Sequence, residues 1–191
     1  MSNAHHHGRI KLLFILLMCA VPVVAASIAF DLWQPRFGTM NYGELLPPSP
    51  MPDAPVRLVE GREFRMSELH GKWVLLQVDS AACDQSCRQK LYYLRQVRLT
   101  QGKDMQRIER VWIIDDNGTP EPNLMKEYAG TWLIRGAGSA LLAALPAANS
   151  AKDHVYVIDP KGNLILRFPS DADPRKMVKD ITRLLKVSQI G

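Results

Sequence analysis

Cysteine is scarce in this chain of 191 residues, which contains three. Cys19 lies within an apolar run, so Cys83 and Cys87 are the two cysteines of the more polar remainder. Structural zinc sites take four Cys or His ligands, often as two cysteine pairs, and this chain has only one such pair. The scarcity argues against zinc and leaves one disulfide or one site with two thiolates.

The chain also lacks a long run of basic residues, although its net charge is +5. Its 24 Lys and Arg residues are scattered, so they form no stripe along which a nucleic-acid backbone would lie. The G-x-G at Gly136 and Gly138 follows no strand–loop–helix pattern of the kind that binds nucleotides. We therefore expect no nucleic-acid partner, and the basic charge slightly favours a surface near anionic lipid.

A single long apolar run, residues 12–30, contains no charged residue. Its length is close to the roughly 20 residues of a membrane-spanning helix. Arg9 and Lys11 precede the run and Asp31 follows it, and positive residues stay on the cytoplasmic side. The run therefore predicts a single-pass anchor in the inner (cytoplasmic) membrane, with the later residues in the periplasm or another extracytoplasmic space. The alternative is a signal peptide cleaved after Ala26.

The pattern along the chain predicts four regions. Residues 1–11 form a cytoplasmic tail and residues 12–30 the transmembrane anchor. Residues 31–55 contain the proline-rich stretch "GELLPPSPMPDAP" and are expected to form an extended linker without regular elements. Residues 56–191 form the folded domain.

Within the folded domain, strand and helix signals alternate. The largely apolar stretches 73–78 and 110–115 indicate two buried central strands. After the cysteines, apolar residues recur at helical spacing until Gly102 ends the helix. Asp173 and Pro174 are typical of the start of a closing helix, and "HVYVIDPKGNLILRFP" is typical of a hairpin. The order predicts an α/β domain with a mixed sheet flanked by helices.

The cysteine pair lies between the first central strand and the following helix. The free N–H groups of a helix start favour a thiolate, and Arg88 and Lys90 add positive charge nearby. If Cys83 lies just outside the helix and Cys87 in its first turn, the two sulfurs point the same way and a disulfide is permitted. A purely structural bridge is the alternative, although so short a loop gives it little entropic benefit.

These segments resemble the thioredoxin superfamily. Two sequence segments carry the resemblance, "EFRMSELHGKWVLLQV" and "YVIDPKGNLILRF", together with the closing helix. The resemblance covers roughly residues 56–188. The resemblance implies a thioredoxin-like sheet flanked by helices. Reductases of this superfamily use C-x-x-C and a cis-proline, whereas this chain has C-x-x-x-C and Asp153 at the proline position.

The C-x-x-x-C spacing of Cys83 and Cys87 after a central strand resembles the Sco family, which consists of membrane-anchored copper proteins that help assemble cytochrome c oxidase. The resemblance implies copper held by both cysteines and one histidine. Ala151 stands where that histidine is expected, so His154, three residues later, is the candidate third ligand. Arg88 replaces the proline that usually follows the second cysteine of the Sco motif.

Three functions follow, and the sequence leaves open whether the protein is an enzyme. The first is a membrane-anchored factor that aids respiratory oxidase assembly by copper handling or thiol reduction through Cys83 and Cys87. Its partners would be an oxidase subunit or a copper chaperone. The second is an exported thiol–disulfide oxidoreductase without metal. The third is a non-catalytic thioredoxin-fold module that docks a partner and has a structural disulfide.

Overall fold

The computed structural model describes residues 3–32, 41–169 and 171–188. The chain divides into two compact units, one up to residue 40 and one from Asn41 onward. The first unit contains helix α1 (Asn3–Leu32), which includes the predicted anchor and has Pro22 inside it. Among the described residues, no helix has the length and apolar character needed to cross a membrane.

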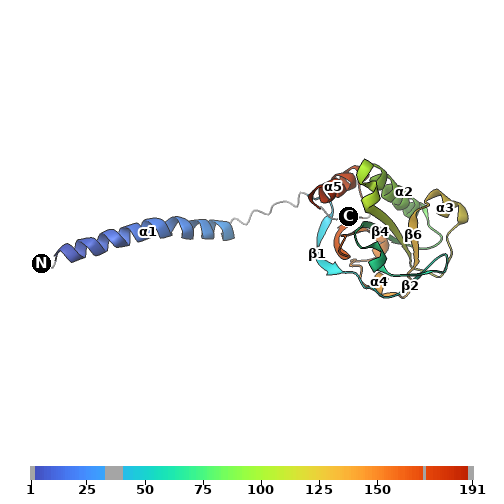
Figure 1. The fold of residues 1–191 in the computed structure, drawn as a ribbon, viewed down its shortest axis with the longest axis horizontal. Helices are drawn as coiled ribbons and strands as arrows, with labels where there is room; N and C mark the ends of the chain where they lie inside the picture. The colour runs from blue at the N-terminus through green and yellow to red at the C-terminus, as the bar shows by residue number, and fades with distance from the viewer. Residues whose placement is uncertain (1–2, 33–40, 170, 189–191) are drawn as a thin grey trace. The chain divides into compact units, whose positions relative to one another are not determined.

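The second unit is built on one mixed sheet. Its eight strands follow the order β1-β8-β7-β4-β5-β6-β2-β3 (Figure 1). Strands β4, β5 and β6 are parallel to one another, and β7 is antiparallel to β4, so the sheet is mixed, as the sequence predicts. The strands are β1 (Glu44–Pro50), β2 (Val56–Leu58), β3 (Glu63–Phe64), β4 (Trp73–Asp79), β5 (Ile108–Ile114), β6 (Thr131–Arg135), β7 (Val155–Ile158) and β8 (Asn163–Phe168).

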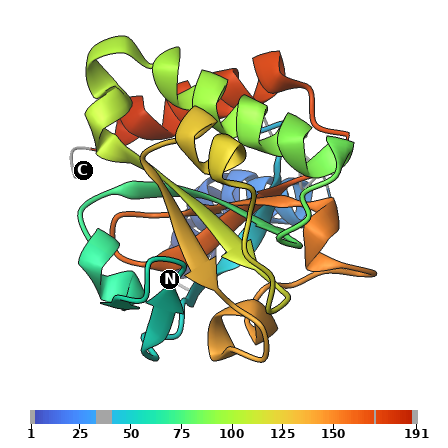
Figure 2. The same cartoon turned by 90° about the vertical axis from the view of Figure 1, so that its right-hand side faces the viewer.

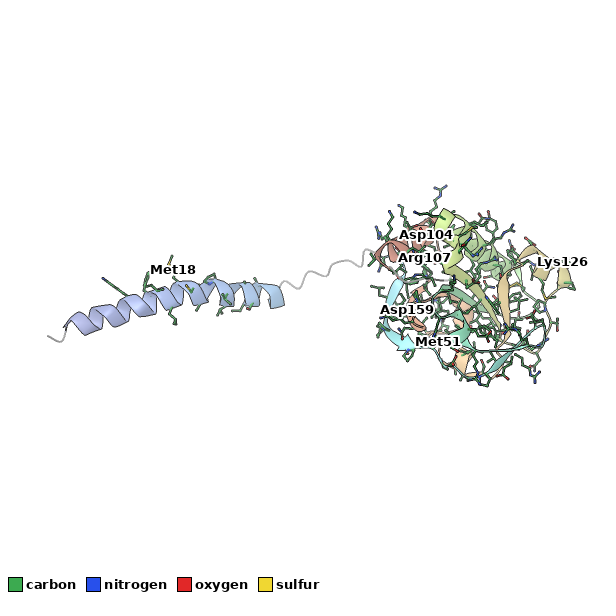
Figure 3. All side chains as sticks on the ribbon, viewed as in Figure 1. Met18, Met51, Asp104, Arg107, Lys126 and Asp159 are labelled. Atoms are coloured by element: carbon green, nitrogen blue, oxygen red, sulfur yellow. A yellow bond between two sulfur atoms is a disulfide. The ribbon has the colours of Figure 1, made fainter. Side chains whose placement is uncertain are left out.

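Helices cover both faces of this sheet. Helices α2 (Gln85–Leu99) and α5 (Pro174–Val187) lie side by side over one face (Figure 2). Leu69 of η1 and Leu141 of α4 belong to the core on the opposite face. The remaining short elements are η1 (Met66–Leu69), η2 (Gly102–Arg107), α3 (Pro122–Glu127), α4 (Ala140–Ala143) and η3 (Ala151–Asp153). The ion pair of Asp104 and Arg107 lies in η2, on the side of the domain away from Lys126 of α3 (Figure 3).

Strand β4 separates two hydrophobic cores. All seven of its residues are buried, because both of its faces are covered. Val74 and Leu76 belong to the core beside η1 and α4, whereas Trp73 and Leu75 belong to the core beneath α2 and α5. This alternation decides which side chains meet the cysteines, since successive residues of a strand point to opposite faces.

The predicted linker contains a strand, so the expectation of no regular element in residues 31–55 was wrong for β1. This strand pairs antiparallel with β8 at the edge of the sheet, with a register shift between Leu45 and Ser49. Prolines are tolerated there because one side of an edge strand needs no hydrogen-bond partner. Met51, just after β1, donates from its N–H to Gly162 O (2.9 Å), near Asp159 in the β7–β8 turn (Figure 3).

The last part of the domain agrees with its predicted elements. The β7–β8 hairpin closes through Gly162, whose φ is +87° and whose N–H donates to Asp159 O. Asp173 caps α5 by accepting a hydrogen bond from the Arg175 N–H, and Pro174 takes the first helical position. Both features are local, which is why the sequence could predict them.

Candidate redox site

The cysteine loop connects the C-terminal end of β4 to the start of α2. Cys83 lies just before the helix and Cys87 is its third residue, as predicted. The two sulfurs form a disulfide, and the two Cα atoms are 5.0 Å apart. The predicted geometry of the pair is therefore present, in its oxidised form.

The bridge is enclosed rather than open to solvent. Cys83 is 2% exposed and Cys87 is 0% exposed, and both pack with Leu91 and Trp112. Cys83 has a φ of +42°, in the left-handed region that a non-glycine residue enters at a cost of about 1–2 kcal/mol. The chain before the helix is thus held in an unfavourable conformation at the bridge itself.

Three carboxylates hold the loop through its backbone N–H groups. Asp79 accepts from the Ser80 N–H (3.0 Å) and Asp116 accepts from the Ala81 N–H (3.1 Å). Asp84 caps α2 by accepting from the Cys87 N–H at 2.9 Å. The capping carboxylate occupies one of the N–H groups that would otherwise stabilise a thiolate at this helix start.

A buried ion pair lies beside the loop. The Nζ of Lys90 is 2.8 Å from Asp79 Oδ2, and the two side chains are 7% and 9% exposed. The same ammonium donates to the carbonyl oxygens of Val78 (3.0 Å) and Lys152 (2.6 Å). Three acceptors therefore satisfy a buried positive charge.

The charges predicted to favour a thiolate are engaged elsewhere. Lys90 is paired with Asp79, and Arg88 pairs with Glu121 at 3.2 Å on the surface. Lys152 pairs with Asp115 at 2.9 Å. The hydrogen bond that Lys152 donates to Asp115 raises the pKa of Lys152, and attraction to this carboxylate and to others nearby adds to the increase.

One polar side chain of β4 reaches the disulfide. Gln77 is fully buried, and its Nε2 lies 3.8 Å from Cys87 Sγ. Its Oε1 has no hydrogen-bond partner within the described residues. No other side chain in the described residues donates a hydrogen bond to either sulfur.

The ring of His154, the predicted third ligand, packs against Tyr156. Its ring stacks edge-on against Tyr156, at 5.9 Å between centroids, and Tyr156 belongs to the core opposite α2. Its Nδ1 is 3.1 Å from the carbonyl oxygen of Phe168 on β8, so this nitrogen carries the proton and donates. Gln77, by contrast, pairs with Val155, whose side chain lies on the α2 face.

Two thiolates are the metal ligands that this loop offers. In the described part of the chain, no group of three or more His, Cys, Asp or Glu side chains is placed to hold a metal ion. The donor set of a trigonal Cu(I) site therefore lacks its third member in this oxidised arrangement.

Sequence reasoning missed the contributions of Gln77, Asp79 and Asp116. A signal existed for Gln77, which is the one polar residue in the predicted strand 73–78. The pairing of Asp79 with Lys90 depends on how α2 packs on the sheet, which no short-range pattern shows. The contact of Asp116 with the Ala81 N–H joins residues 35 positions apart, so no local pattern shows it either.

A comparison with protein families identifies the chain. The family described as "Transmembrane-like, thioredoxin-like, C-terminal domain" matches residues 73–188, which contain the cysteine loop and most of the sheet. The chain belongs to this family. No curated protein matches the sequence.

Solved structures share the fold. Yeast Sco1 with copper bound matches with a TM-score of 0.61 and 19% identity, over 75% of this chain and 96% of that one. A putative protein disulfide isomerase from Bacteroides thetaiotaomicron matches at 0.57 and 20%, over 75% and 92%. Apo Sco1 from Thermus thermophilus matches at 0.56 and 18%, over 78% and 99%. The resemblance to the thioredoxin superfamily and to Sco proteins is confirmed at the level of the fold.

Proposed function

We propose that this family member is a thiol–disulfide exchange protein in which Cys83 and Cys87 alternate between dithiol and disulfide. The observation that supports the proposal is the disulfide at the junction of β4 and α2, in a loop where Cys83 is held in the left-handed region. We further propose that its targets are cysteines of a respiratory oxidase under assembly, because Sco-type proteins share this fold.

The bridge is poorly suited to a purely stabilising role. It joins residues only four positions apart, and closing so short a loop is worth about 2 kcal/mol in the chain-entropy account. The left-handed conformation of Cys83 offsets much of that gain. A bridge with so little net benefit to folding is better explained by chemistry.

The exchange reaction balances without a metal. In the reduced protein, one cysteine thiolate attacks a partner disulfide, forms a mixed disulfide and releases the partner's first thiolate. The second cysteine then attacks its neighbour's sulfur, which releases the partner's second thiolate and closes the Cys83–Cys87 bridge. Two electrons pass to the partner, and an extracytoplasmic dithiol donor returns them.

The burial of the pair sets the order of attack. Cys87 is fully enclosed, whereas Cys83 precedes the helix between the exposed residues Ala82 and Asp84. Reduction also frees Cys83 to leave its left-handed conformation. We therefore assign Cys83 as the sulfur that meets the partner and Cys87 as the one that resolves the mixed disulfide.

Copper handling is the second candidate, and the fold shared with a copper-bound Sco1 favours it. Cys83, Cys87 and His154 would hold Cu(I), which the protein would pass on as cargo. This requires reduction of the bridge and a rearrangement of His154, whose ring lies beside Tyr156 and whose Nδ1 donates to Phe168 O. Anaerobic Cu(I) titration of the reduced protein tests it: equal binding by wild type and Cys83→Ser/Cys87→Ser excludes it.

We also propose that residues 12–30 attach the domain to the inner membrane and place it in the periplasm. The proposal rests on the uncharged sequence of this segment and on the basic residues before it. In addition, the large apolar side chains described on α1, such as Phe14, Leu17 and Val23, are more than half exposed and need an apolar environment.

Trapping of the mixed disulfide tests the exchange function. The full-length chain in detergent micelles, as Cys83→Ser and as Cys87→Ser, is incubated with oxidised glutathione. We expect Cys87→Ser, which retains the outer sulfur, to form the glutathione adduct at Cys83 more rapidly than Cys83→Ser forms it at Cys87, as measured by mass spectrometry of peptides. If neither variant forms an adduct at its remaining cysteine of the pair while both remain folded, the bridge is structural and the proposal fails.

A further inference from the structure

Gln77 is a buried amide whose hydrogen bonds are incomplete in the oxidised protein. It lies in the middle of β4, between Trp112 on β5 and Val155 on β7. A side-chain amide has two N–H donors and one carbonyl acceptor, and buried groups of this kind are nearly always paired. Here Nε2 approaches Cys87 Sγ at 3.8 Å, while Oε1 is unpartnered within the described residues.

The disulfide cannot complete these bonds. A bridged sulfur has no hydrogen, so Cys87 Sγ can accept weakly from the amide but cannot donate to it. The apolar neighbours of Cys87, including Leu91 and Trp112, bring no donor to the amide oxygen. An unpaired acceptor in this enclosed position makes the oxidised state less favourable.

Reduction changes the chemistry of the same sulfur atom. Two electrons and two protons convert the bridge into two thiols, and the S–H of Cys87 becomes a donor next to the amide. If the thiol ionises, the thiolate accepts from the Nε2–H group more strongly than a disulfide sulfur does. Both reduced forms therefore interact better with Gln77 than the oxidised form does.

We propose that Gln77 is a positioning residue that shifts the Cys83–Cys87 pair toward its reduced form. Burial strengthens the effect, because Gln77 is fully enclosed and electrostatic interactions are stronger in such a low-dielectric environment. The relevance of this shift to target proteins rests on the proposed exchange function, because exchange requires the cysteine pair to be reduced and oxidised in turn.

The redox equilibrium of the full-length chain in detergent micelles tests this inference. The pair is equilibrated with mixtures of reduced and oxidised glutathione, and the fraction of dithiol is measured by thiol alkylation. For Gln77→Leu we expect an equilibrium constant for reduction about tenfold lower than wild type, which corresponds to a potential about 30 mV more negative. Gln77→Met, which has a more adaptable side chain, gives the same shift if Leu fits poorly.

A matched control lies on the same helix as Cys87. Gln89 is exposed and its Nε2 donates to the Tyr93 hydroxyl, so Gln89→Leu removes an amide two residues from Cys87 without changing the enclosed site. We expect its equilibrium constant to match that of wild type. An unchanged or increased constant in both Gln77 variants would overturn the inference.

Unfolding by urea separates this role from simple packing. Gln77→Leu removes an unpaired acceptor from the oxidised protein, so the oxidised form becomes more stable, while the reduced form becomes less stable. A residue that only fills space changes both forms in the same direction and by the same amount, and that result would contradict the inference. A failure of glutathione trapping would refute the exchange function but would leave this unfolding comparison unaffected, because the comparison does not depend on exchange with glutathione.

Discussion

The two faces of the sheet around β4 and β7 enclose polar groups of different kinds. On the face covered by α2, the disulfide, the Gln77 amide and the Lys90–Asp79 ion pair are all buried. On the opposite face, Tyr156 donates to a backbone carbonyl, that of Pro146 at 3.0 Å. The first face combines charge, an unpaired acceptor and a reducible bond, whereas the second has a satisfied neutral group. Reactivity is therefore expected on the α2 face, and the other face contributes to stability.

The largest expected effect is the difference in glutathione reactivity between a variant of the two cysteines and a variant of His154. Cys83→Ser/Cys87→Ser removes the bond that exchanges, so reaction with glutathione at these two positions should be lost completely. His154→Ala should react at a rate within about twofold of wild type, because the ring lies on the opposite face and contacts Tyr156 and Phe168 O. Alkylation-quenched kinetics measure both. A loss in His154→Ala comparable to that of the cysteine variant would mean that the two faces form one site.

The next effect compares two ion pairs near the cysteine loop. Lys90→Met leaves Asp79 buried without its partner, and we expect the free energy of unfolding to fall by about 3 kcal/mol. Lys152→Met breaks a more exposed pair with Asp115, in which the side chains are 39% and 21% exposed, and should cost below about 1 kcal/mol. Urea unfolding gives both values, and equal losses would show that burial does not distinguish the two pairs.

A smaller effect concerns the opposite face at high pH. Burial raises the pKa of Tyr156 from its usual 10.0 to about 12. Because the folded state holds this proton more tightly than the unfolded state, its contribution to stability is complete below pH 10 and is lost as the pH rises to about 12. Tyr156→Phe should cost about 1 kcal/mol at neutral pH, through the lost bond to Pro146, and should flatten this alkaline decline. A decline as steep as that of wild type would contradict the assignment.

The smallest effect is that of His154 on stability. Its ring donates a hydrogen bond to Phe168 O, and replacing the ring by the side chain of Gln keeps a donor of similar reach. We expect His154→Gln to change the free energy of unfolding by less than about 1 kcal/mol and to leave the reduction potential of the cysteines unchanged. A shift of that potential would mean that the His154 ring interacts with the two sulfur atoms, either electrostatically or by direct contact.

Local signals explain what the sequence could predict. The β7–β8 hairpin follows from the turn at Asp159–Gly162, and α5 from the cap at Asp173, because each depends on residues within a few positions. The placement of the cysteines at a helix start was likewise a local property. Strand β1 was missed because its prolines resemble a linker, and only pairing with distant β8 makes it a strand.

Long-range packing explains what the sequence could not predict. Lys90 donates to Lys152 O, 62 positions away, and that contact exists only once η3 lies beside β4. The side on which His154 lies depends on the register of β7 against β4, where a shift by one residue reverses the face. The resemblance to the Sco family indicated His154 as a third ligand, but only the register shows which face its ring occupies.

The reduction potential of the Cys83–Cys87 pair in the wild-type full-length chain tests the central claim most directly. Equilibration with glutathione at neutral pH, followed by alkylation, gives its value. The account predicts a potential above about −300 mV, in the range where exchange with other dithiols is reversible. A potential below about −300 mV, with no exchange on prolonged incubation, would identify a structural bridge and contradict the account.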